Sequence, residues 1–283
     1  RRDASRSSRH HIDYMDFFWK RVMIPLYDHL GKLVGFAGRA LTADAEIKYL
    51  NTPEESRVHG NKTSFQKRRV LFGLNRAVQA IRQQKEVFLT EGYFDVIAAQ
   101  QAGIENIVAA SGTAFTAEQV HLLRRFTDRV IIVMDNDTAG QEGAKKAVKV
   151  AYGAGLNPRI APLPRRYKDI DDFIRGEAEP LTAFHTLPKM DIVDFHLYRH
   201  EIPPAGADAR LQVLDEMLDF FELESSLARK MAWMQRAAER LQLDHHILEE
   251  RFLERYDQLR HERNGRVHNG SAIDIPTLFI ANL

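Results

Sequence analysis

The sequence predicts an α/β fold, in which a parallel sheet is preceded by an α+β subdomain and followed by a helical subdomain. Residues 86–162 alternate short apolar runs with helical segments, which is typical of a parallel sheet covered on both faces. The residues before them predict a β-hairpin, and residues 190–262 show apolar side chains at helical spacing. We therefore expect segments at residues 1–84, 85–189 and 190–262, with a tail or linker at 263–283.

The first segment is expected to begin with the hairpin. Arg21–Tyr27 and Leu33–Phe36 are strand-like, and the residues between them have turn composition. Loops are expected at 43–46 and 51–61, and a helix at Leu74–Gln84. Residues 1–90 carry 17 Lys and Arg against 9 Asp and Glu. This balance favours a basic surface for a polyanion, although chance clustering on solvated faces would give the same count.

The second segment predicts four strands with helices between them. The strands are expected at Val87–Thr90, Ile107–Ala109, Val130–Met134 and Arg159–Ala161. The helices are expected at Tyr93–Gln101, Thr116–Phe126 and Ala139–Tyr152. Thr116 and Gln119 have the spacing of a capping box, which supports a helix start at that point.

The third segment repeats apolar residues every three or four positions. Two such faces consist of Leu214, Met217, Leu218 and Phe221, and of Met231, Met234, Ala238 and Leu241. We interpret these residues as helical core, not as cofactor contacts.

Composition excludes several classes of site. The chain has 283 residues and no Cys, so a disulfide scaffold, a thiolate metal site and a Cys nucleophile are excluded within it. Its longest aliphatic run, Val130–Met134, is far shorter than the ~20 residues that span a bilayer, and no membrane association is expected. The chain begins with Arg, which suggests a fragment of a longer protein.

Acidic residues gather at the predicted strand ends. Six carboxylates lie at or beyond these ends. Glu91 and Asp135 directly follow a strand, Asp95 and Asp137 lie within one helical turn of them, and Asp169 and Asp171 come after the strand near Arg159–Ala161, beyond Leu163 and Pro164. Ligands of parallel sheets bind at the carboxyl ends of strands, and like charges brought together there require a cation. Oxygen ligands favour Mg²⁺ or Mn²⁺, ions that support phosphoryl transfer. The alternative for any single Asp, above all Asp137, is a helix N-cap.

Histidines give no comparable pattern. His10, His11, His121, His245 and His246 lack an evident set of partners, so we interpret them as surface or packing residues. Zinc is therefore not expected in this chain.

The predicted strand ends carry three strings, EGYFDV at 91–96, SGTAFT at 111–116 and DNDTAG at 135–140. These strings resemble the Toprim motifs of bacterial DnaG-type DNA primases. Strings upstream resemble the same family in the same order: RVMIP at 21–25, GFAGR at 35–39, KYLNTP at 48–53 and LFGL at 71–74. The resemblance covers residues 17–180 strongly. Toprim motifs also occur in topoisomerases and nucleases, and the upstream strings favour a primase.

The resemblance implies a Toprim-type parallel sheet and roles for particular residues. It implies catalytic roles for Glu91, Asp135 and Asp137, and binding of Mg²⁺ or Mn²⁺ by all six carboxylates. It implies nucleotide binding by Lys48, Tyr49 and Asn51, and nucleic-acid binding by Arg21, Arg39 and Lys67. Asn136 stands where the family usually has Gly, and Asn tolerates unusual backbone angles, so the turn is expected to form.

The implied activity is that of a primase RNA-polymerase core, which makes short RNA primers on single-stranded DNA from ribonucleoside triphosphates. The expected place is the replication fork in the bacterial cytoplasm. A replicative helicase is the expected partner, through a C-terminal domain that this chain lacks. The alternatives are another Toprim enzyme, such as a metal-dependent nuclease, and a non-catalytic module that binds single-stranded DNA. The presence of all six carboxylates speaks against a decayed site.

Overall fold

The computed structural model describes residues 16–42, 44–55, 63–110, 115–200, 204–221, 223–224 and 226–266, without the side chains of 256–266. The chain divides into two compact units, Arg1–Pro188 and Lys189–Leu283. The predictions for His10 and His11, for residues 111–114 of the second motif and for most of the tail lie outside the described residues. The predicted boundary between residues 84 and 85 falls inside the first unit and stays a prediction.

The first unit begins with an antiparallel sheet of strands β1 (Arg21–Tyr27), β2 (Leu33–Ala40) and β3 (Tyr49–Asn51), in the order β1-β2-β3. The predicted hairpin is confirmed, with β2 longer than expected. Strand β3 was not expected from the sequence. It forms because Tyr49–Asn51 pairs with Ala37–Arg39 of β2, a contact between segments that no local pattern reveals.

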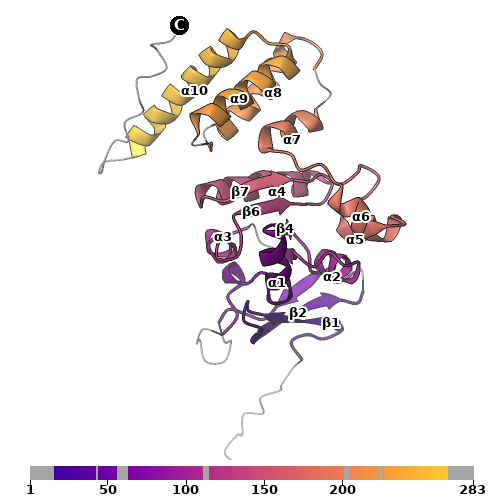
Figure 1. Ribbon diagram of the computed structural model, residues 1–283. Coiled ribbons are helices and arrows are strands. Elements are labelled where there is room, and N and C mark those ends of the chain that lie inside the picture. The colour runs from indigo at the N-terminus through magenta and orange to yellow at the C-terminus, as the bar shows by residue number, and fades with distance from the viewer. Residues whose placement is uncertain are drawn as a thin grey trace, which may run out of the picture. The chain divides into compact units, whose positions relative to one another are not determined.

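A parallel sheet follows, with strands β4 (Val87–Thr90), β5 (Ile107–Ala109), β6 (Arg129–Ile132) and β7 (Asn157–Ile160). The strand order is β5-β4-β6-β7, and every neighbouring pair is parallel. Figure 1 shows β6 between β4 and β7. The connection from β4 to β5 runs in one direction along the sheet and that from β6 to β7 in the other. Right-handed crossovers then place their helices, α2 (Tyr93–Gln101) and α4 (Thr138–Gly153), on opposite faces. A crevice opens where the direction reverses, between the ends of β4 and β6.

Both faces of this sheet are buried. Phe88, Ile107 and Ile131 point into one core, together with residues of α2, α5 (Ile170–Gly176) and α6 (Pro180–His185). The alternate residues Val87 and Leu89 are equally buried on the other face, where α4 packs on β6 and β7. Burial on both faces explains why the strands are continuous apolar runs.

The two sheets of the first unit share one core region. Tyr93, at the start of α2, packs with Ile24, Leu26 and Ala37 of the antiparallel sheet. Phe72 exchanges backbone hydrogen bonds with Ala109 of β5 at 2.9 and 3.0 Å. The N-terminal strands are therefore fixed to the parallel sheet close to the ends of β4 and β5.

Most predicted helices of the first unit are confirmed. Helix α1 (Leu74–Gln84) and α2 have the expected bounds. Helix α3 (Ala117–Leu123) begins with the predicted capping box, in which Gln119 N–H donates to Thr116 Oγ1 and Thr116 N–H to Gln119 Oε1. Helices α5 and α6 and the short 3₁₀ helix η1 (Lys67–Arg69) were not predicted.

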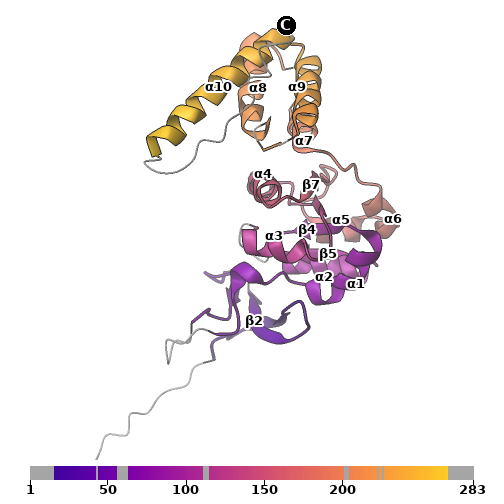
Figure 2. The same cartoon turned by 60° about the vertical axis from the view of Figure 1, so that its left-hand side comes forward.

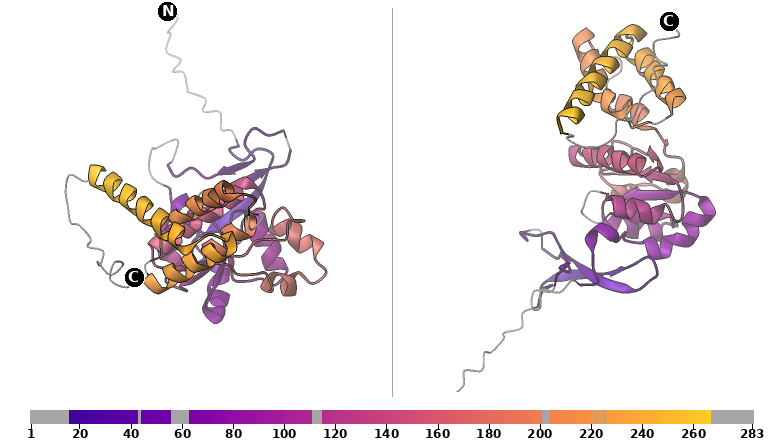
Figure 3. Two further views of the ribbon diagram at one scale, coloured as in Figure 1. Left: turned by 90° about the horizontal axis from the view of Figure 1, so that it is seen from above. Right: turned by 90° about the vertical axis from the view of Figure 1, so that its left-hand side faces the viewer.

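The second unit is helical in its described part, as predicted. It contains α7 (Ile192–Arg199), α8 (Ala207–Phe221), α9 (Leu227–Leu241) and α10 (His245–Arg266). Helices α8, α9 and α10 contact one another, and α7 contacts α8 and α9 (Figures 2 and 3). The predicted core residues Leu214, Met217 and Met234 are buried, whereas Met231 is exposed. No helix in the described part of the chain is both long enough and apolar enough to cross a membrane.

A buried carboxylate fixes α7 to α9. Asp191 caps α7 by accepting a hydrogen bond from Asp194 N–H at 2.9 Å. Its second oxygen accepts one from Trp233 Nε1 at 3.0 Å and pairs with Arg236. Asp191 is only 4% exposed, so its charge depends on these partners.

We expect Asp191→Ala to lower the free energy of unfolding of the second unit by about 3 kcal/mol. The change removes a helix cap, the acceptor of the buried Trp233 Nε1–H and one of the two carboxylates that pair with Arg236, the other being Asp194. Urea unfolding followed by Trp233 fluorescence measures this change. Asp208→Ala, in the first turn of α8, should change stability by less than about 0.5 kcal/mol. A loss below about 1 kcal/mol for Asp191→Ala would show that the network contributes little.

Candidate active site

One pocket of the first unit collects most of the predicted site residues. It is lined by Arg39, Lys48, Tyr49, Asn51, Lys67, Glu91, Gly92, Tyr93, Phe94, Asp95, Asp135, Lys168, Asp169 and Asp171. Ten of the twelve predicted residues are among them, and Arg21 and Asp137 are not. The pocket lies at the crevice between β4 and β6, and it joins carboxylates from the parallel sheet to cations from the N-terminal strands.

Glu91 follows β4 directly, and Asp135 lies three residues beyond the end of β6. Burial raises the pKa of the Glu91 carboxyl above its ordinary value, and the charges of Asp135 and Asp137 raise it further. Burial also raises the pKa of Asp135, with Asp169 and Asp137 adding to the effect and Lys168 and Lys48 opposing it. Glu91 Oε1 is buried and accepts no hydrogen bond from any residue that the structure describes. These carboxylates are therefore partly desolvated and mutually repulsive.

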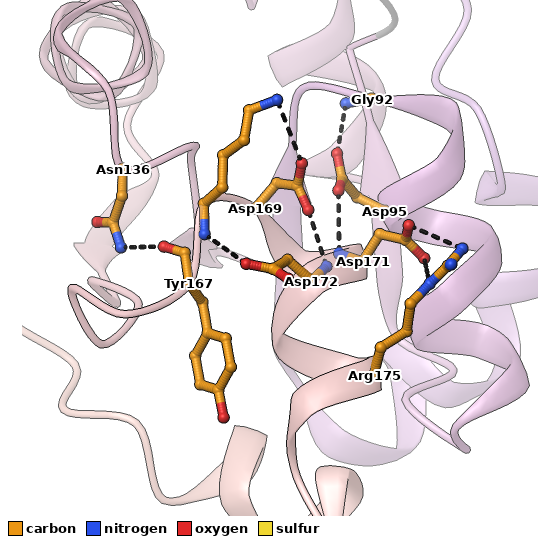
Figure 4. A network of polar contacts seen from close by, with 9 residues as sticks. Gly92, Asp95, Asn136, Tyr167, Asp169, Asp171, Asp172 and Arg175 are labelled. Atoms are coloured by element: carbon orange, nitrogen blue, oxygen red, sulfur yellow. Dashed lines mark hydrogen bonds and ion pairs between the residues drawn. The ribbon is translucent and has the colours of Figure 1, made fainter.

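Asp95 lies deeper, in the first turn of α2. Its two oxygens accept hydrogen bonds from Gly92 N–H at 3.2 Å and Asp171 N–H at 3.4 Å. Burial, with the charges of Asp135 and Asp169, raises the pKa of Asp95 to about 7 although both hydrogen bonds act in the opposite direction. Asp95 thus links the start of α2 to the start of α5 (Figure 4).

Asp137 caps α4 beside the pocket. Its Oδ1 accepts a hydrogen bond from Gly140 N–H at 2.7 Å, so the N-cap alternative holds for this residue. The cap does not remove it from the acidic cluster, because its charge raises the pKa of both Glu91 and Asp135. Gly140 allows this turn to close, since a Cβ at that position would lie 2.3 Å from the Asp135 carbonyl oxygen.

The third acidic pair lies at the start of α5. Asp169 caps the helix by accepting from Asp172 N–H at 2.8 Å. Asp171 forms an ion pair with Arg175 one turn later, with Oδ2 3.0 Å from Nη2. The side chain of Asp172 accepts a hydrogen bond from Lys168 N–H at 3.0 Å. Asp169 thus faces the cluster with less compensation than Asp171.

Asn136 fixes the second acidic loop to the third. Its side-chain amide donates to the carbonyl oxygens of Leu163 at 3.2 Å, Pro164 at 3.0 Å and Tyr167 at 2.7 Å, and its N–H donates to Lys168 O at 2.8 Å. In the described chain, positive φ angles outside glycine occur at Lys20, Lys85 and Gln242. The turn forms as expected, but at a φ that is not positive, and the hydrogen bonds of Asn136 are the physical reason for its fit.

The opposite wall is basic and aromatic. Tyr93 donates from its hydroxyl to Asn51 Oδ1 at 3.2 Å, and its ring lies 5.8 Å from that of Tyr49 at a tilt of 51°, which positions β3 over the pocket. Arg39 lies over the Phe94 ring at 4.4 Å. Burial raises the pKa of the Tyr49 hydroxyl, against the effect of Arg39, so this group remains a hydrogen-bond donor at neutral pH.

Two predicted nucleic-acid contacts differ in position. Lys67 lines the pocket, and its backbone N–H donates to Glu54 Oε1 at 2.8 Å. Arg21 does not line it, because its guanidinium donates to the carbonyl oxygens of Gly38, Lys48 and Ile47 at 3.1, 3.3 and 2.8 Å. Arg21 therefore fastens the segment before β3, and a role in nucleic-acid binding stays a prediction.

Sequence reasoning gave no role to Lys168, Tyr93 and Phe94, which also line the pocket. Lys168 Nζ lies 4.0 Å from Asp169 Oδ2, and its charge lowers the pKa of Asp135. Its position directly before the Asp169–Asp171 pair was the sequence feature that could have indicated a place in the pocket. Tyr93 and Phe94 lie inside the first motif, but their packing on another sheet is not visible in the sequence.

The acidic residues fit a divalent cation. All of the available ligand atoms are oxygens. The Glu91 Oε1 atom is buried without a hydrogen-bond partner among the described residues. Burial and mutual repulsion raise the pKa values of three carboxyl groups, those of Glu91, Asp95 and Asp135. A divalent cation would give the buried oxygen a partner and would neutralise the repulsion between the carboxylates. Hard cations such as Mg²⁺ and Mn²⁺ match this chemistry.

The fold and the acidic site define a Toprim-like protein, and residues 88–174 match the family described as Toprim-like. Residues 3–78 match the DNA primase catalytic core, N-terminal domain. The chain belongs to the DnaG-type DNA primase family.

Individual relatives agree with this assignment. The DNA primase of Listeria monocytogenes is 32% identical over 273 residues, which cover 95% of this chain and 42% of the relative. The solved E. coli primase catalytic core is 30% identical with a TM-score of 0.62, covering 80% of this chain and 71% of that one. A DnaG primase catalytic domain bound to single-stranded DNA is 31% identical with a TM-score of 0.63, covering 82% and 72%. The chain spans less than half the length of the curated relatives that it matches first.

We expect Gly140→Ala to destabilise the first unit by about 1–3 kcal/mol, since the new methyl group would displace the Asp135 backbone. Gly153→Ala is the matched control in the same helix, where a Cβ meets no atom within 4 Å. That control should be neutral or up to about 1 kcal/mol stabilising, because Ala favours helix. Urea unfolding of both variants measures the contrast, and equal effects would contradict the close packing of α4 on Asp135.

The stability of the metal-free chain should fall as pH rises from about 4 to about 7. Over this range folded Asp95 holds a proton that the unfolded chain has lost, because folding raises its pKa from 3.8 to about 7. Each unit of pKa difference corresponds to about 1.4 kcal/mol.

Asp95→Asn keeps a hydrogen-bond acceptor but cannot ionise, so it should lose less stability than the wild type between pH 5 and pH 8. Urea unfolding in EDTA at both pH values measures the difference, and added Mg²⁺ should reduce it. Equal losses in the two proteins would show that Asp95 ionises normally.

Proposed function

We propose that this chain is the RNA-polymerase core of a DNA primase, a nucleotidyltransferase that makes short RNA primers on single-stranded DNA. One observation carries the proposal: a single pocket joins partly buried carboxylates with raised pKa values to Arg39, Lys48, Lys67 and Lys168. An acidic wall with a basic wall opposite suits a substrate that brings both phosphate charge and a bound cation.

The acidic wall is proposed to hold Mg²⁺ or Mn²⁺. We assign this role to Glu91, Asp135, Asp137 and Asp169 at the strand ends, with Asp95 behind them. Asp171 is a weaker candidate, because Arg175 already compensates its charge. When bound, the ion supplies positive charge against the triphosphate and the departing pyrophosphate.

The basic wall is proposed to bind the nucleotide and the template. Lys48 and Lys168 already lower the pKa of Asp135, so both are close enough to meet a phosphate beside the acidic wall. Tyr49 and Asn51 offer a hydroxyl and an amide on β3, where the Tyr93 hydroxyl fixes Asn51. Arg39 and Lys67 would then contact phosphates of nucleic acid, with an affinity that falls as salt rises.

The proposed reaction joins two nucleotides. The 3′-hydroxyl oxygen of the primer attacks the α-phosphorus of a ribonucleoside triphosphate, a new P–O bond forms, and the bond to pyrophosphate breaks. The hydroxyl proton leaves to solvent or to a carboxylate of the acidic wall. The chain contributes orientation and electrostatic stabilisation, which are the main terms in phosphoryl transfer.

Single-stranded DNA is the proposed template, and the related catalytic domain bound to single-stranded DNA supports this assignment. A replicative helicase as partner and a cytoplasmic location at the bacterial replication fork follow from family membership alone. Both stay predictions.

A primer-synthesis assay tests the function. The chain is incubated with single-stranded DNA, labelled ribonucleotides and Mg²⁺ or Mn²⁺, and the products are resolved on a sequencing gel. Asp135→Asn should lower RNA synthesis about 100-fold or more, as removal of an electrostatic group at a transition state does. Asp128→Asn is the matched control, because this exposed carboxylate precedes the same strand, β6, at its opposite end.

Template-dependent RNA that is lost in Asp135→Asn and kept in Asp128→Asn would support the primase core. Metal-dependent cutting of the DNA without RNA would favour the nuclease alternative. Salt-sensitive DNA binding without either product would favour a binding module. Equal synthesis by both variants would remove Asp135 from the catalytic site.

A further inference from the structure

A second group of metal-type ligands lies in the helical unit, far along the sequence from the acidic pocket. His196 is on α7, His200 caps the C-terminus of that helix, and Glu216 is on α8. Each of the three residues offers one ligand atom, a ring nitrogen or a carboxylate oxygen. These three atoms lie within 4.8 Å of one another. The proposed primase function uses none of these three residues.

The spacing on the helix explains how the two imidazoles converge. Residues four apart lie on the same helix face, and the rings of His196 and His200 have centroids 4.8 Å apart. Glu216 Oε2 lies 3.2 Å from His196 Nε2 and 3.8 Å from His200 Nε2. Ligands at about 2.0–2.1 Å from a tetrahedral zinc ion are separated by about 3.3 Å, so small side-chain movements suffice.

The surroundings suit a metal on the rim of a packed core. The side chain of His196 is 1% exposed and lies against Phe220, with ring centroids 5.9 Å apart. The side chains of His200 and Glu216 are 33% and 42% exposed, which leaves a path from solvent. The fixed inner ligand orients the site, and the outer two can close on an ion.

We propose that His196, His200 and Glu216 bind one Zn²⁺-class transition-metal ion, which links α7 to α8 and leaves a coordination position for water. Imidazole nitrogen selects Zn²⁺, Cu²⁺ or Ni²⁺, whereas the all-oxygen acidic pocket selects Mg²⁺ or Mn²⁺. The two sites are thus chemically distinct. Such an ion would stabilise the helical unit by binding only its folded form. The proposal differs from the expectation, based on Cys content and the other histidines, that the chain binds no zinc, and the metal-binding test below decides between them.

A different interpretation uses the same contacts without a metal. Protonated His196 and His200 would pair with Glu216 and hold α7 against α8 as an ion-paired cluster. The two interpretations differ in one measurable quantity, which is stoichiometric metal uptake.

The test is equilibrium dialysis of the full chain against Zn²⁺, with Mg²⁺ in large excess to compete at the acidic pocket. The chain should retain one Zn²⁺. His200→Ala and Glu216→Gln should each weaken retention at least about tenfold, which is the smallest effect expected from losing a supporting group, let alone a ligand. Both positions are partly exposed, so neither change should unfold the unit, which circular dichroism verifies.

His245→Ala is the matched control, because this exposed His pairs with Glu249 one turn away at 3.2 Å, outside the cluster. It should keep full Zn²⁺ binding, and so should Asp135→Asn, which separates this site from the acidic pocket. Zn²⁺ should raise the melting temperature of the wild type and His245→Ala, and not that of His200→Ala. No stoichiometric Zn²⁺, or equal retention by His200→Ala, Glu216→Gln and the wild type, would overturn the proposal.

Discussion

Repulsion between carboxylates is the constraint on which the first unit depends. The strand order β5-β4-β6-β7 brings the acidic ends of β4 and β6 to one crevice, where burial and neighbouring charges raise the pKa values of Glu91, Asp95 and Asp135. The chain offsets this cost locally. Asp137 and Asp169 accept from helix N-termini, Asp95 accepts from two backbone N–H groups, and Arg175 pairs with Asp171. The carboxylate charge that these contacts leave unbalanced lies where a cation would bind.

The same crevice explains why the N-terminal strands belong to the same unit. In the proposed function, a triphosphate held by the cation alone would have no partners on its outer side. The β1-β2-β3 sheet supplies Arg39, Lys48 and Tyr49 there, and Tyr93 and Phe94 of α2 hold that sheet in place. Residues of both sheets thus line one pocket, which the proposed function uses for binding and for chemistry.

Much of the first unit could be predicted from sequence, because its strands are continuous apolar runs and its acidic residues lie in the segments that follow them. The strand Val87–Thr90 and the helices Leu74–Gln84 and Tyr93–Gln101 have the predicted bounds. Strand β3 could not be predicted, since it forms only by pairing with β2. The contribution of Asn136 depends on carbonyl groups about 30 residues away, and that of Arg21 on carbonyls of two other segments. The His196–Glu216 contact crosses two helices, so periodicity gives each helix but not their pairing.

The first turn of α2 cannot gain or lose a residue without losing its contacts. Three successive residues serve three different neighbours: Tyr93 packs on the antiparallel sheet, Phe94 lies under Arg39, and Asp95 receives the N–H groups of Gly92 and Asp171. Successive helical residues are rotated by about 100°. An insertion or deletion of one residue between Gly92 and Asp95 would rotate every one of these side chains to the wrong neighbour. Substitution is therefore the only change that this turn can accept, whereas a surface loop of the same unit can also gain or lose residues.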